Sequence, residues 1–247
     1  MDQKKEEIGH LYHQETKYRR EAMPRGGLDW VHQPSPYKEF PDLLKHFQIR
    51  PLDQHGSKPI WEVIAQRRSI REFLHQSITF SELSQMVWAT QGVTSRAWGF
   101  DFRATPSAGA LYPIETYIVV NRVEEIPPGI YHYNVKEAKL SLLREGDFGS
   151  DLCHAGLDQE MLEEAACVFI WTAIVQRSKW KYRERAYRYI YMDVGHIGQN
   201  LYLAATALNL GCCTVGAFFD EEVDRLIGVD GKGEISLYLG AIGRIRH

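Results

Sequence analysis

Cysteine is scarce in this 247-residue sequence, and the four that occur are not spaced for metal binding. No two of them are separated by two residues, which argues against a zinc knuckle or a redox dithiol. Two are adjacent inside an apolar run, as is typical of small buried side chains in a reducing compartment. We therefore expect no metal site and free thiols at Cys153, Cys167, Cys212 and Cys213.

Long apolar runs and a strong net charge are also missing. No apolar run approaches the ~20 residues that a membrane span requires, and the charged residues at 2–7 do not resemble a signal peptide. The formal net charge is −3, and the basic cluster at 179–188 is balanced by acidic residues elsewhere. These absences predict a cytoplasmic protein that binds neither nucleic acid nor membrane.

The familiar nucleotide-binding and nucleophile motifs are absent as well. The glycines at 228–233 lack phosphate-loop spacing, and no Gly-x-Gly-x-x-Gly follows a predicted strand. Ser107 is not in a Gly-x-Ser-x-Gly elbow, so a turn serine is a better interpretation than a nucleophile. Asp193 and His196 stand one helical turn apart, but no third metal ligand has a recognisable spacing, which favours a histidine packed in the helix core.

The composition is that of an ordinary globular domain, with 44% hydrophobic and 25% charged residues. Residues 1–56 are polar and interrupted by prolines, so we expect an extended N-terminal arm with at most a short initial helix. Such an arm commonly lies across a surface or a partner subunit, and disorder is the alternative. Residues 57–247 carry the periodic patterns of one folded domain.

Hydrophobic periodicity predicts the order of elements in that domain. Helical patterns begin at residue 59 and cover 80–90, 149–165, 186–210 and 221–227, and strand patterns cover 115–120, 129–143, 166–175, 212–218 and 235–242. The Gly-, Ser- and Pro-rich stretch 93–113 is predicted to be one long functional loop. Gly195 and Gly198 weaken the longest helix by ~1 kcal/mol each, so we expect close packing or a ligand there. Helices and strands do not alternate strictly, which favours an α+β domain.

One basic stretch, Arg67-Arg68-Ser69-Ile70-Arg71, ends the first helical pattern. Its three guanidiniums are rigid forks of donors that suit a phosphate, and Ser69 adds one more hydrogen bond. A simpler interpretation exists, because basic side chains in a last helical turn also offset the helix dipole, by ~0.3–1 kcal/mol. Taken alone, the stretch favours this simpler interpretation.

Five segments in order change that balance. They are Arg67-Arg68-Ser69-Ile70-Arg71, Pro106-Ser107-Ala108-Gly109-Ala110-Leu111-Tyr112-Pro113, Lys181-Tyr182-x-Glu184-Arg185, Asp193-Val194-Gly195-His196-Ile197-Gly198-Gln199-Asn200-Leu201, and 211–218. From about residue 59 to the C-terminus, the sequence resembles the nitroreductase family of flavoproteins. Within that family it is similar to the SagB-type dehydrogenase branch, which includes azoline oxidases of peptide-modifying systems.

The resemblance implies an α+β nitroreductase-like fold, in which helices flank a central, mainly antiparallel sheet. It also implies an intertwined homodimer that binds FMN in a cleft at the subunit interface. Arg67, Ser69 and Arg71, with Arg68 beside them, are expected to hold the FMN phosphate and ribityl chain. The loop of Pro106, Ser107, Ala108 and Gly109, with Leu111, is expected to reach across from the partner subunit and line the flavin ring.

Further roles follow from the same resemblance. Gly216 and Ala217 are expected to offer backbone N–H groups near flavin N5, where they steady charge during hydride transfer. Relatives usually supply another basic residue to the phosphate near the C-terminus. We prefer Arg244 to Arg246, because Gly243 before it leaves room for the cofactor; the alternative is a tail charge in water. Since the sequence ends at His247, we expect residues 1–56 to take the wrapping role of the longer tail in relatives.

Lys181 and Tyr182 are the most mechanistic match. They correspond to a pair that, in azoline-oxidising relatives, takes the proton while hydride passes to FMN. A desolvated lysine can act as a base near neutral pH, and tyrosine can orient or relay the proton. A solvated basic face is the alternative, since Lys179, Arg183 and Arg185 surround the pair.

Together these expectations describe an FMN-dependent oxidoreductase that works by ping-pong hydride transfer. Its substrate is expected to be a small organic or azoline-like molecule, or a modified peptide. Two alternatives bind the same cofactor. One is an NAD(P)H-dependent nitro- or quinone reductase, with NAD(P)H as the electron donor, and the other is a non-catalytic FMN-binding scaffold. No leader-peptide-binding segment is recognisable, so a peptide substrate is inferred from the branch alone.

Overall fold

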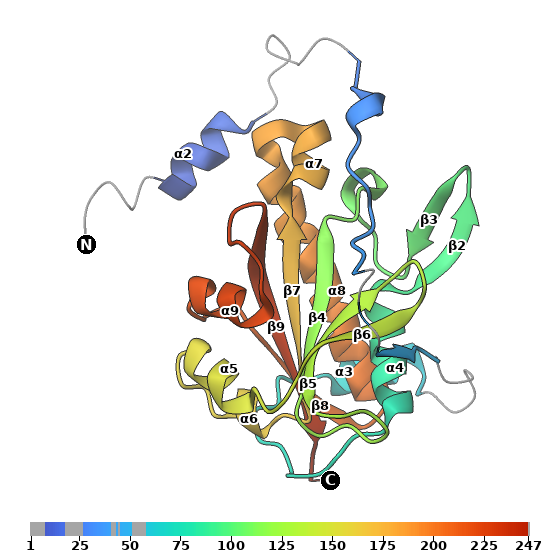
Figure 1. Ribbon diagram of the computed structural model, residues 1–247, viewed down its shortest axis with the longest axis vertical. Coiled ribbons are helices and arrows are strands. Elements are labelled where there is room, and N and C mark those ends of the chain that lie inside the picture. The colour runs from blue at the N-terminus through green and yellow to red at the C-terminus, as the bar shows by residue number, and fades with distance from the viewer. Residues whose placement is uncertain (1–7, 18–26, 41–42, 44, 51–57, 247) are drawn as a thin grey trace.

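A computed structural model describes residues 8–17, 27–40, 43, 45–50 and 58–246. The charged residues at 2–7 lie outside this part of the chain. The described residues form a seven-stranded sheet whose paired strands all run antiparallel, in the order β1-β6-β5-β4-β7-β9-β8 (Figure 1). The strands are β1 (His46–Gln48), β4 (Ile114–Val120), β5 (Gly129–Asn134), β6 (Lys139–Glu145), β7 (Cys167–Ile174), β8 (Leu210–Val215) and β9 (Glu234–Arg244). The antiparallel sheet confirms the predicted fold class.

Helices cover both faces of this sheet. Figure 1 shows α5, α6 and α9 on one side and α3, α4 and α8 on the other. Their bounds are α3 (Ile60–Gln66), α4 (Phe80–Gln91), α5 (Gly149–Ala155), α6 (Met161–Glu164), α8 (Ala186–Ala207) and α9 (Asp220–Ile227). A further helix, α7 (Val175–Tyr182), continues from the end of β7. This layering places two separate apolar cores around one sheet.

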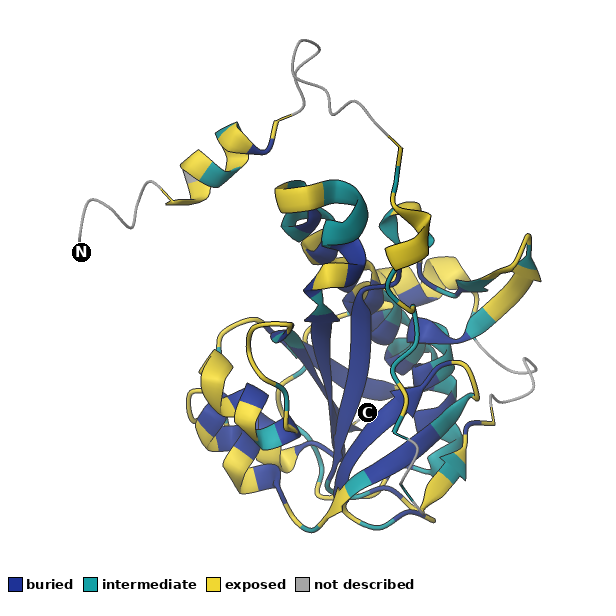
Figure 2. Cartoon of the chain, turned by 45° about the horizontal axis from the view of Figure 1, so that its top comes forward, coloured by how far each residue is buried: buried dark blue, intermediate teal, exposed yellow. Residues whose placement is uncertain are grey.

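The central strand β7 shows why the sheet is buried on both faces. Phe169 and Trp171 pack into the core beneath α4 and α8, whereas Val168 and Ile170 pack into the core beneath α5, α6 and α9. Alternate residues of a strand point to opposite faces, so a strand covered on both sides needs a continuous apolar run. Figure 2 shows the central strands as a dark, buried layer. The apolar run at 166–175 is confirmed as such a strand.

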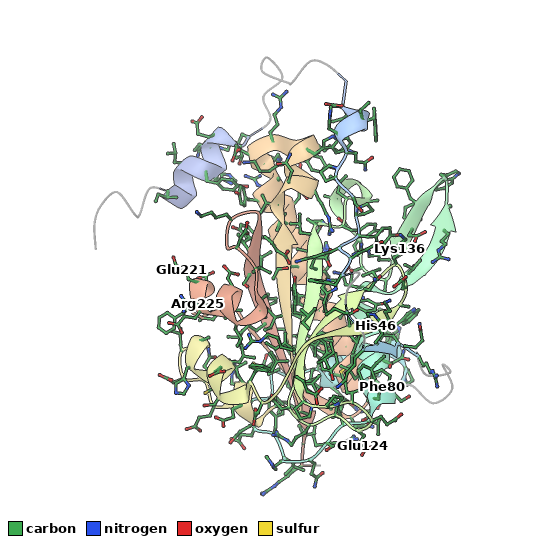
Figure 3. All side chains as sticks on the ribbon, in the orientation of Figure 1. His46, Phe80, Glu124, Lys136, Glu221 and Arg225 are labelled. Atoms are coloured by element: carbon green, nitrogen blue, oxygen red, sulfur yellow. The ribbon has the colours of Figure 1, made fainter. Side chains whose placement is uncertain are left out.

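Local signals position the flanking helices. Thr79 accepts a hydrogen bond from the backbone N–H of Glu82, whose side chain accepts from the Thr79 N–H; this capping box begins α4. On α9, Val223 and Ile227 are buried, while Glu221 and Arg225 are exposed and point away from the sheet (Figure 3). Helix α4 therefore begins at one of the two caps that the sequence predicts, and α9 turns its apolar side chains toward the sheet.

The predicted long loop at 93–113 is wrong in its first half. Residues Val93–Ala97 and Phe100–Arg103 form a β-hairpin, β2 and β3, that projects from the domain (Figure 1). Trp98 and Gly99 connect the strands with positive φ angles of 53° and 78°. Two-residue hairpin turns require positive φ at both central positions, which glycine adopts readily and tryptophan rarely. Because tryptophan is rare at such a position, the sequence pattern did not predict this turn.

Two other segments are more regular than predicted. The charged segment at 176–185 forms helix α7, which breaks at Arg183 with a φ of 52° and continues as a 3-10 turn at Arg183–Arg185. In the N-terminal arm, helix α2 (Ile8–Glu15) agrees with a short initial helix, and a 3-10 turn forms at Trp30–His32. Strand β1 adds an edge to the sheet by pairing with β6. Part of the arm is thus built into the domain.

Candidate functional site

The basic stretch follows α3 and lies against the edge of the sheet. The Ile70 N–H donates to Cys212 O at 2.9 Å, and the Leu74 N–H donates to Arg244 O at 2.8 Å. A Cβ atom on Gly243 would lie 2.7 Å from the Phe73 ring, so glycine there permits Phe73 to pack on β9. The expectation that Gly243 leaves room for a cofactor is therefore wrong, because Phe73 fills that room.

A recess of about 690 Å³ opens beside this stretch. Its lining residues come from the basic stretch and from the C-terminal end of the chain: Ser69, Ile70, Arg71, Glu72, Phe73, Leu74, Ile245 and Arg246. Arg71 and Arg246 are exposed, and neither guanidinium has a hydrogen bond or ion pair with any described residue. Two uncommitted guanidiniums and a hydroxyl at one recess are a suitable donor set for a phosphate.

The other three arginines interact with other parts of the protein. Arg68 donates to Ala65 O at 3.1 Å and to Arg67 O at 2.7 Å, so it satisfies carbonyls at the end of α3. Arg67 lies 5.2 Å above the Tyr202 ring, which leaves its N–H groups available. Arg244 forms a bidentate ion pair with Glu82, at 2.8 Å for each N–O contact. Its neighbour Arg246, rather than Arg244, lines the recess.

A chain of hydroxyl groups leads from the recess into the domain, and sequence reasoning missed it. Ser69 Oγ lies 2.8 Å from the Tyr202 hydroxyl, which accepts from the Thr214 N–H at 2.9 Å. Thr214 Oγ1 in turn lies 2.5 Å from the Tyr238 hydroxyl. A Cβ on Gly198 would lie 2.9 Å from the Tyr238 ring, which explains this glycine in α8. Gly195 has no such neighbour, and nothing in the structure explains it.

Gly216 and Ala217 lie just past the end of β8. Both residues are exposed, and the Ala217 carbonyl accepts a hydrogen bond from Gln159 Nε2 at 2.9 Å. A Cβ atom on Gly216 would lie 3.9 Å from the Tyr238 ring, at the inner end of the hydroxyl chain. Gly216 therefore lies beside the Tyr238 end of the hydroxyl chain, and the other end of that chain, Ser69, belongs to the basic stretch.

The loop after β3 is anchored to α8 by Asp193. Ser107 donates from Oγ to Asp193 Oδ2 at 2.6 Å, and the Ala108 N–H donates to Oδ1 at 3.2 Å. Burial raises the pKa of Asp193, although these two hydrogen bonds lower it. Pro106 and Gly109 of the loop are exposed, whereas Leu111 is buried. Asp193 thus anchors the loop to α8.

The expectation of a core histidine at His196 is wrong, because this side chain is exposed on the outer face of α8. The helical spacing alone did not say which face of α8 would be covered. Within the described ranges, no three His, Cys, Asp or Glu residues gather in a way that could hold a metal ion.

Lys181 and Tyr182 end α7 directly over the same loop. A Cβ atom on Gly109 would lie 2.6 Å from the Tyr182 hydroxyl and 3.0 Å from Lys181 Nζ. Gly109 also has a φ of 66°, a conformation that other residues adopt with strain. Burial raises the pKa of Tyr182, as do Tyr189 and Asp193 beside it. Both predicted catalytic groups therefore contact the glycine of the predicted flavin loop.

The two halves of the candidate site lie on different sides of α8. Asp193 holds the loop, and Tyr202 contacts the basic stretch. Nine residues separate them on one helix, which is about 14 Å along its axis and half a turn around it. Within one chain, the structure therefore brings the loop together with Lys181 and Tyr182, but not with Arg71 and Arg246.

The chain has clear relatives. Residues 64–244 match the Nitroreductase family. The chain is 37% identical over 183 residues to MJ1384 of Methanocaldococcus jannaschii, a protein named as a nitroreductase, and the match covers 74% of this chain and 89% of that protein. It is also 37% identical over 142 residues to the trifolitoxin-processing protein TfxB of Rhizobium leguminosarum bv. trifolii, covering 52% of this chain and 36% of TfxB.

Solved structures show the same fold. A nitroreductase-type protein from Anabaena variabilis superposes with a TM-score of 0.78 at 30% identity, over 95% of this chain and 46% of that one. A chain of the Escherichia coli microcin synthetase McbBCD complex superposes with a TM-score of 0.63 at 19% identity, over 100% of this chain and 95% of that one. Family match, sequence identity and fold agree, and the chain belongs to the nitroreductase family, with trifolitoxin- and microcin-processing proteins among its relatives.

Proposed function

We propose that the protein is an FMN-dependent oxidoreductase of the SagB-type branch, which transfers hydride between FMN and an azoline-like or other small organic substrate. The carrying observation is the placement of Lys181 and Tyr182 against Gly109 in the loop expected to line the flavin. With this loop lining the flavin, as we propose, the same contact would bring a base and a hydroxyl to a substrate stacked on the flavin. The family match supports an oxidoreductase in general, and the relatives named for trifolitoxin and microcin processing support this branch.

The recess beside the basic stretch fits the phosphate of FMN. Arg71 and Arg246 lack partners among the described residues, and Ser69 lies between them and the hydroxyl chain. Two exposed guanidiniums without protein partners at one recess are free to bind one phosphate together. In this proposal Arg67 joins them, while Arg68 stabilises the end of α3. Arg246 takes the role first expected of Arg244, because Glu82 already binds Arg244.

At the reacting end of the site, we assign a separate chemical role to each group. Bound FMN supplies the hydride acceptor. Burial raises the pKa of Tyr182, so its hydroxyl remains protonated at neutral pH and orients or relays a proton. Lys181 then accepts the proton that leaves the substrate carbon next to the hydride donor. Gly216 and Ala217, which are exposed, would offer backbone N–H groups to the flavin.

We propose a homodimer with FMN at its interface. The basic stretch and the loop of one chain lie half a helical turn apart around α8, so a second subunit is needed to bring a loop to each recess. Trp61 and Ile64 on α3 and Tyr191 and Met192 on α8 are large apolar side chains that are exposed in the single chain. Burying such side chains between subunits is favourable.

Oxidation of an azoline ring to an azole removes two hydrogens. One would leave as hydride, for which bound FMN would be the acceptor, and the other as a proton to Lys181; an external electron acceptor such as dioxygen would then be needed for the next turnover. The substrate is proposed to be a small molecule or a modified peptide, because a McbBCD complex chain shares the fold and was solved with truncated pro-MccB17 bound. We propose that this reaction takes place in the cytoplasm. None of the described helices is long and apolar enough to span a membrane.

A pair of anaerobic reductions tests the proposed reaction. FMN-loaded protein is mixed with 2-phenylthiazoline or with NADPH, and the flavin absorbance band is followed. Bleaching by the thiazoline, with formation of 2-phenylthiazole, supports the dehydrogenase. Bleaching by NADPH alone supports instead an NAD(P)H-dependent reductase, and bleaching by neither supports an FMN-binding scaffold. Lys181→Ala should abolish thiazoline oxidation while leaving the bound flavin spectrum unchanged.

A further inference from the structure

A buried arginine of helix α7 connects it by hydrogen bonds to several other segments of the domain. Arg177 lies one helical turn before Lys181 and is only 2% exposed. Its NH1 group donates to Glu115 at 2.5 Å and to Tyr112 O at 3.1 Å, and its Nε donates to Ser35 O at 2.7 Å. One guanidinium therefore joins α7 to strand β4, to the end of the flavin loop and to the N-terminal arm.

The partner of Arg177 is itself rigidly held. Glu115 lies in β4 with 4% exposure, and its other oxygen is 2.6 Å from His132 Nε2 on β5. Burial alone would raise the pKa of Glu115, but the His132 hydrogen bond and the charges of His132, Arg177 and Arg103 outweigh it and lower the pKa to about 2. Glu115 is thus a carboxylate that stays ionised at neutral pH, held on β4 and bonded to β5, and it gives Arg177 of α7 a fixed partner.

The N-terminal arm follows α7 from outside. Trp180 donates from its indole N–H to Asp29 O at 2.7 Å, and its ring meets Trp30 edge to face at a centroid distance of 5.3 Å. Further along, Pro36 O accepts from Arg103 at 2.8 Å. In Figure 1 the blue segment containing the Trp30–His32 turn descends beside α7. We call residues 29–37 the strap.

We propose that Arg177 is a positioning residue that, together with the strap, holds α7 so that Lys181 and Tyr182 stay against Gly109. Arg177 has no contact with the proposed substrate position and acts through the helix. The geometry requires a guanidinium, because a lysine ammonium is a point charge without a rigid fork. This inference rests on the proposed role of Lys181 and Tyr182. It also assigns a role to part of residues 1–56.

Arg177→Lys tests this inference in the full chain loaded with FMN. Deuterium exchange of the peptide covering 175–185 and acetylation of Lys181 by an amine-reactive ester are followed by mass spectrometry. Both should become faster than in the wild type, while FMN affinity stays unchanged. With 2-phenylthiazoline, kcat should fall on the order of 10-fold or more with little change in KM, because misplacement by about 1 Å weakens catalysis strongly.

Arg122→Lys is the matched control. Arg122 is half-buried, and its hydrogen bonds go to Glu164 O and Ala165 O, which belong neither to α7 nor to the strap. It should lower the melting temperature without speeding exchange at 175–185. Should Arg177→Lys not fold, Trp30→Ala removes an exposed strap contact and should speed the same exchange to a lesser extent.

The inference is overturned if Arg177→Lys and Trp30→Ala both leave exchange at 175–185 and Lys181 acetylation at wild-type rates. Failure of the proposed function looks different. In that case Lys181→Ala has no effect on oxidation, or no flavin binds, while the exchange measurement still reports whether Arg177 holds α7.

Discussion

The arginines of the candidate site carry the same charge but have different roles, and their contacts distinguish those roles. Arg244 is bound by Glu82, and Arg68 by helix carbonyls, whereas Arg71 and Arg246 have no partner among the described residues. Sequence reasoning placed phosphate recognition in the basic stretch and preferred Arg244 as its C-terminal contributor. It could not foresee that a residue 162 positions earlier, Glu82, would bind that side chain.

Replacing Arg246 or Arg244 by alanine should change different properties of the protein. Arg246→Ala should weaken FMN binding roughly 10-fold, since a charge-assisted hydrogen bond to phosphate is lost, and should leave the melting temperature unchanged. Arg244→Ala should lower the melting temperature, because it breaks the Glu82 ion pair, and change FMN affinity little. Fluorescence titration with FMN and thermal unfolding measure both; a larger affinity loss in Arg244→Ala would contradict the assignment.

The buried carboxylate of Glu115 predicts a specific acid sensitivity. Its pKa is about 2 in the folded chain and about 4.5 when unfolded, so the unfolded chain binds its proton first as pH falls. The stabilisation it provides is complete above pH 4.5 and is lost as pH falls from there toward 2. Urea unfolding between pH 2 and 6 should show this slope, and Glu115→Gln should flatten it. An equal slope in both proteins contradicts the prediction.

At the scale of elements, α8 is the support on which both halves of the site are built. The sequence period predicts this helix well, because Val194, Ile197 and Leu201 recur on its buried face. The period does not predict that the glycines differ: Gly198 packs on Tyr238, whereas Gly195 has open space. Close approach depends on which strand lies opposite, and that is set by long-range topology.

The two glycines therefore respond differently to alanine. In the single chain, where no atom lies within 4 Å of the new methyl group, Gly195→Ala should stabilise the fold by about 0.5–1 kcal/mol, because it removes backbone freedom from the unfolded chain. Gly198→Ala should destabilise it by about 1–3 kcal/mol, because the new methyl group would lie 2.9 Å from the Tyr238 ring. Urea unfolding of both variants measures the free energies. Stabilisation by both substitutions would mean that Tyr238 yields easily.

Helix α7 and the hairpin β2–β3 mark the limit of local patterns. The charged segment at 176–185 has no apolar period, yet it is helical because Arg177 and Ser178 are buried against other segments. The hairpin turn has the expected glycine at Gly99, but Trp98 stands where Asn, Asp or Gly is usual. Tertiary contacts therefore override the local sequence in α7, whereas the exposed hairpin rests on its own cross-strand pairing.

At the scale of the whole molecule, the site is completed by a second subunit in our account. The predicted fold class and central strands were recovered from the sequence, since apolar runs and alternation are strong signals. The edge strand β1 was not, because three residues that pair with β6 carry too little pattern. The exposed apolar side chains of α3 and α8 are visible only once the fold shows which faces are covered.

A negative charge introduced among the exposed apolar side chains of α3 and α8 should separate the subunits. Trp61→Glu places a carboxylate where a tryptophan is 79% exposed in the single chain, so the monomer should keep its fold while the dimer dissociates and FMN affinity falls. Trp98→Glu is the matched control, since Trp98 is 88% exposed on the hairpin tip, away from α3. Light scattering gives the mass; a Trp61→Glu protein that remains dimeric places the interface elsewhere.

The most direct test of the central claim is an absorbance titration of the purified, flavin-free full chain with FMN. We predict saturation at one FMN per chain, with a perturbed flavin spectrum, and weaker binding when Arg71 and Arg246 are both replaced by alanine. A protein that shows no flavin absorbance after purification, and that cannot be reconstituted with FMN, would contradict the account.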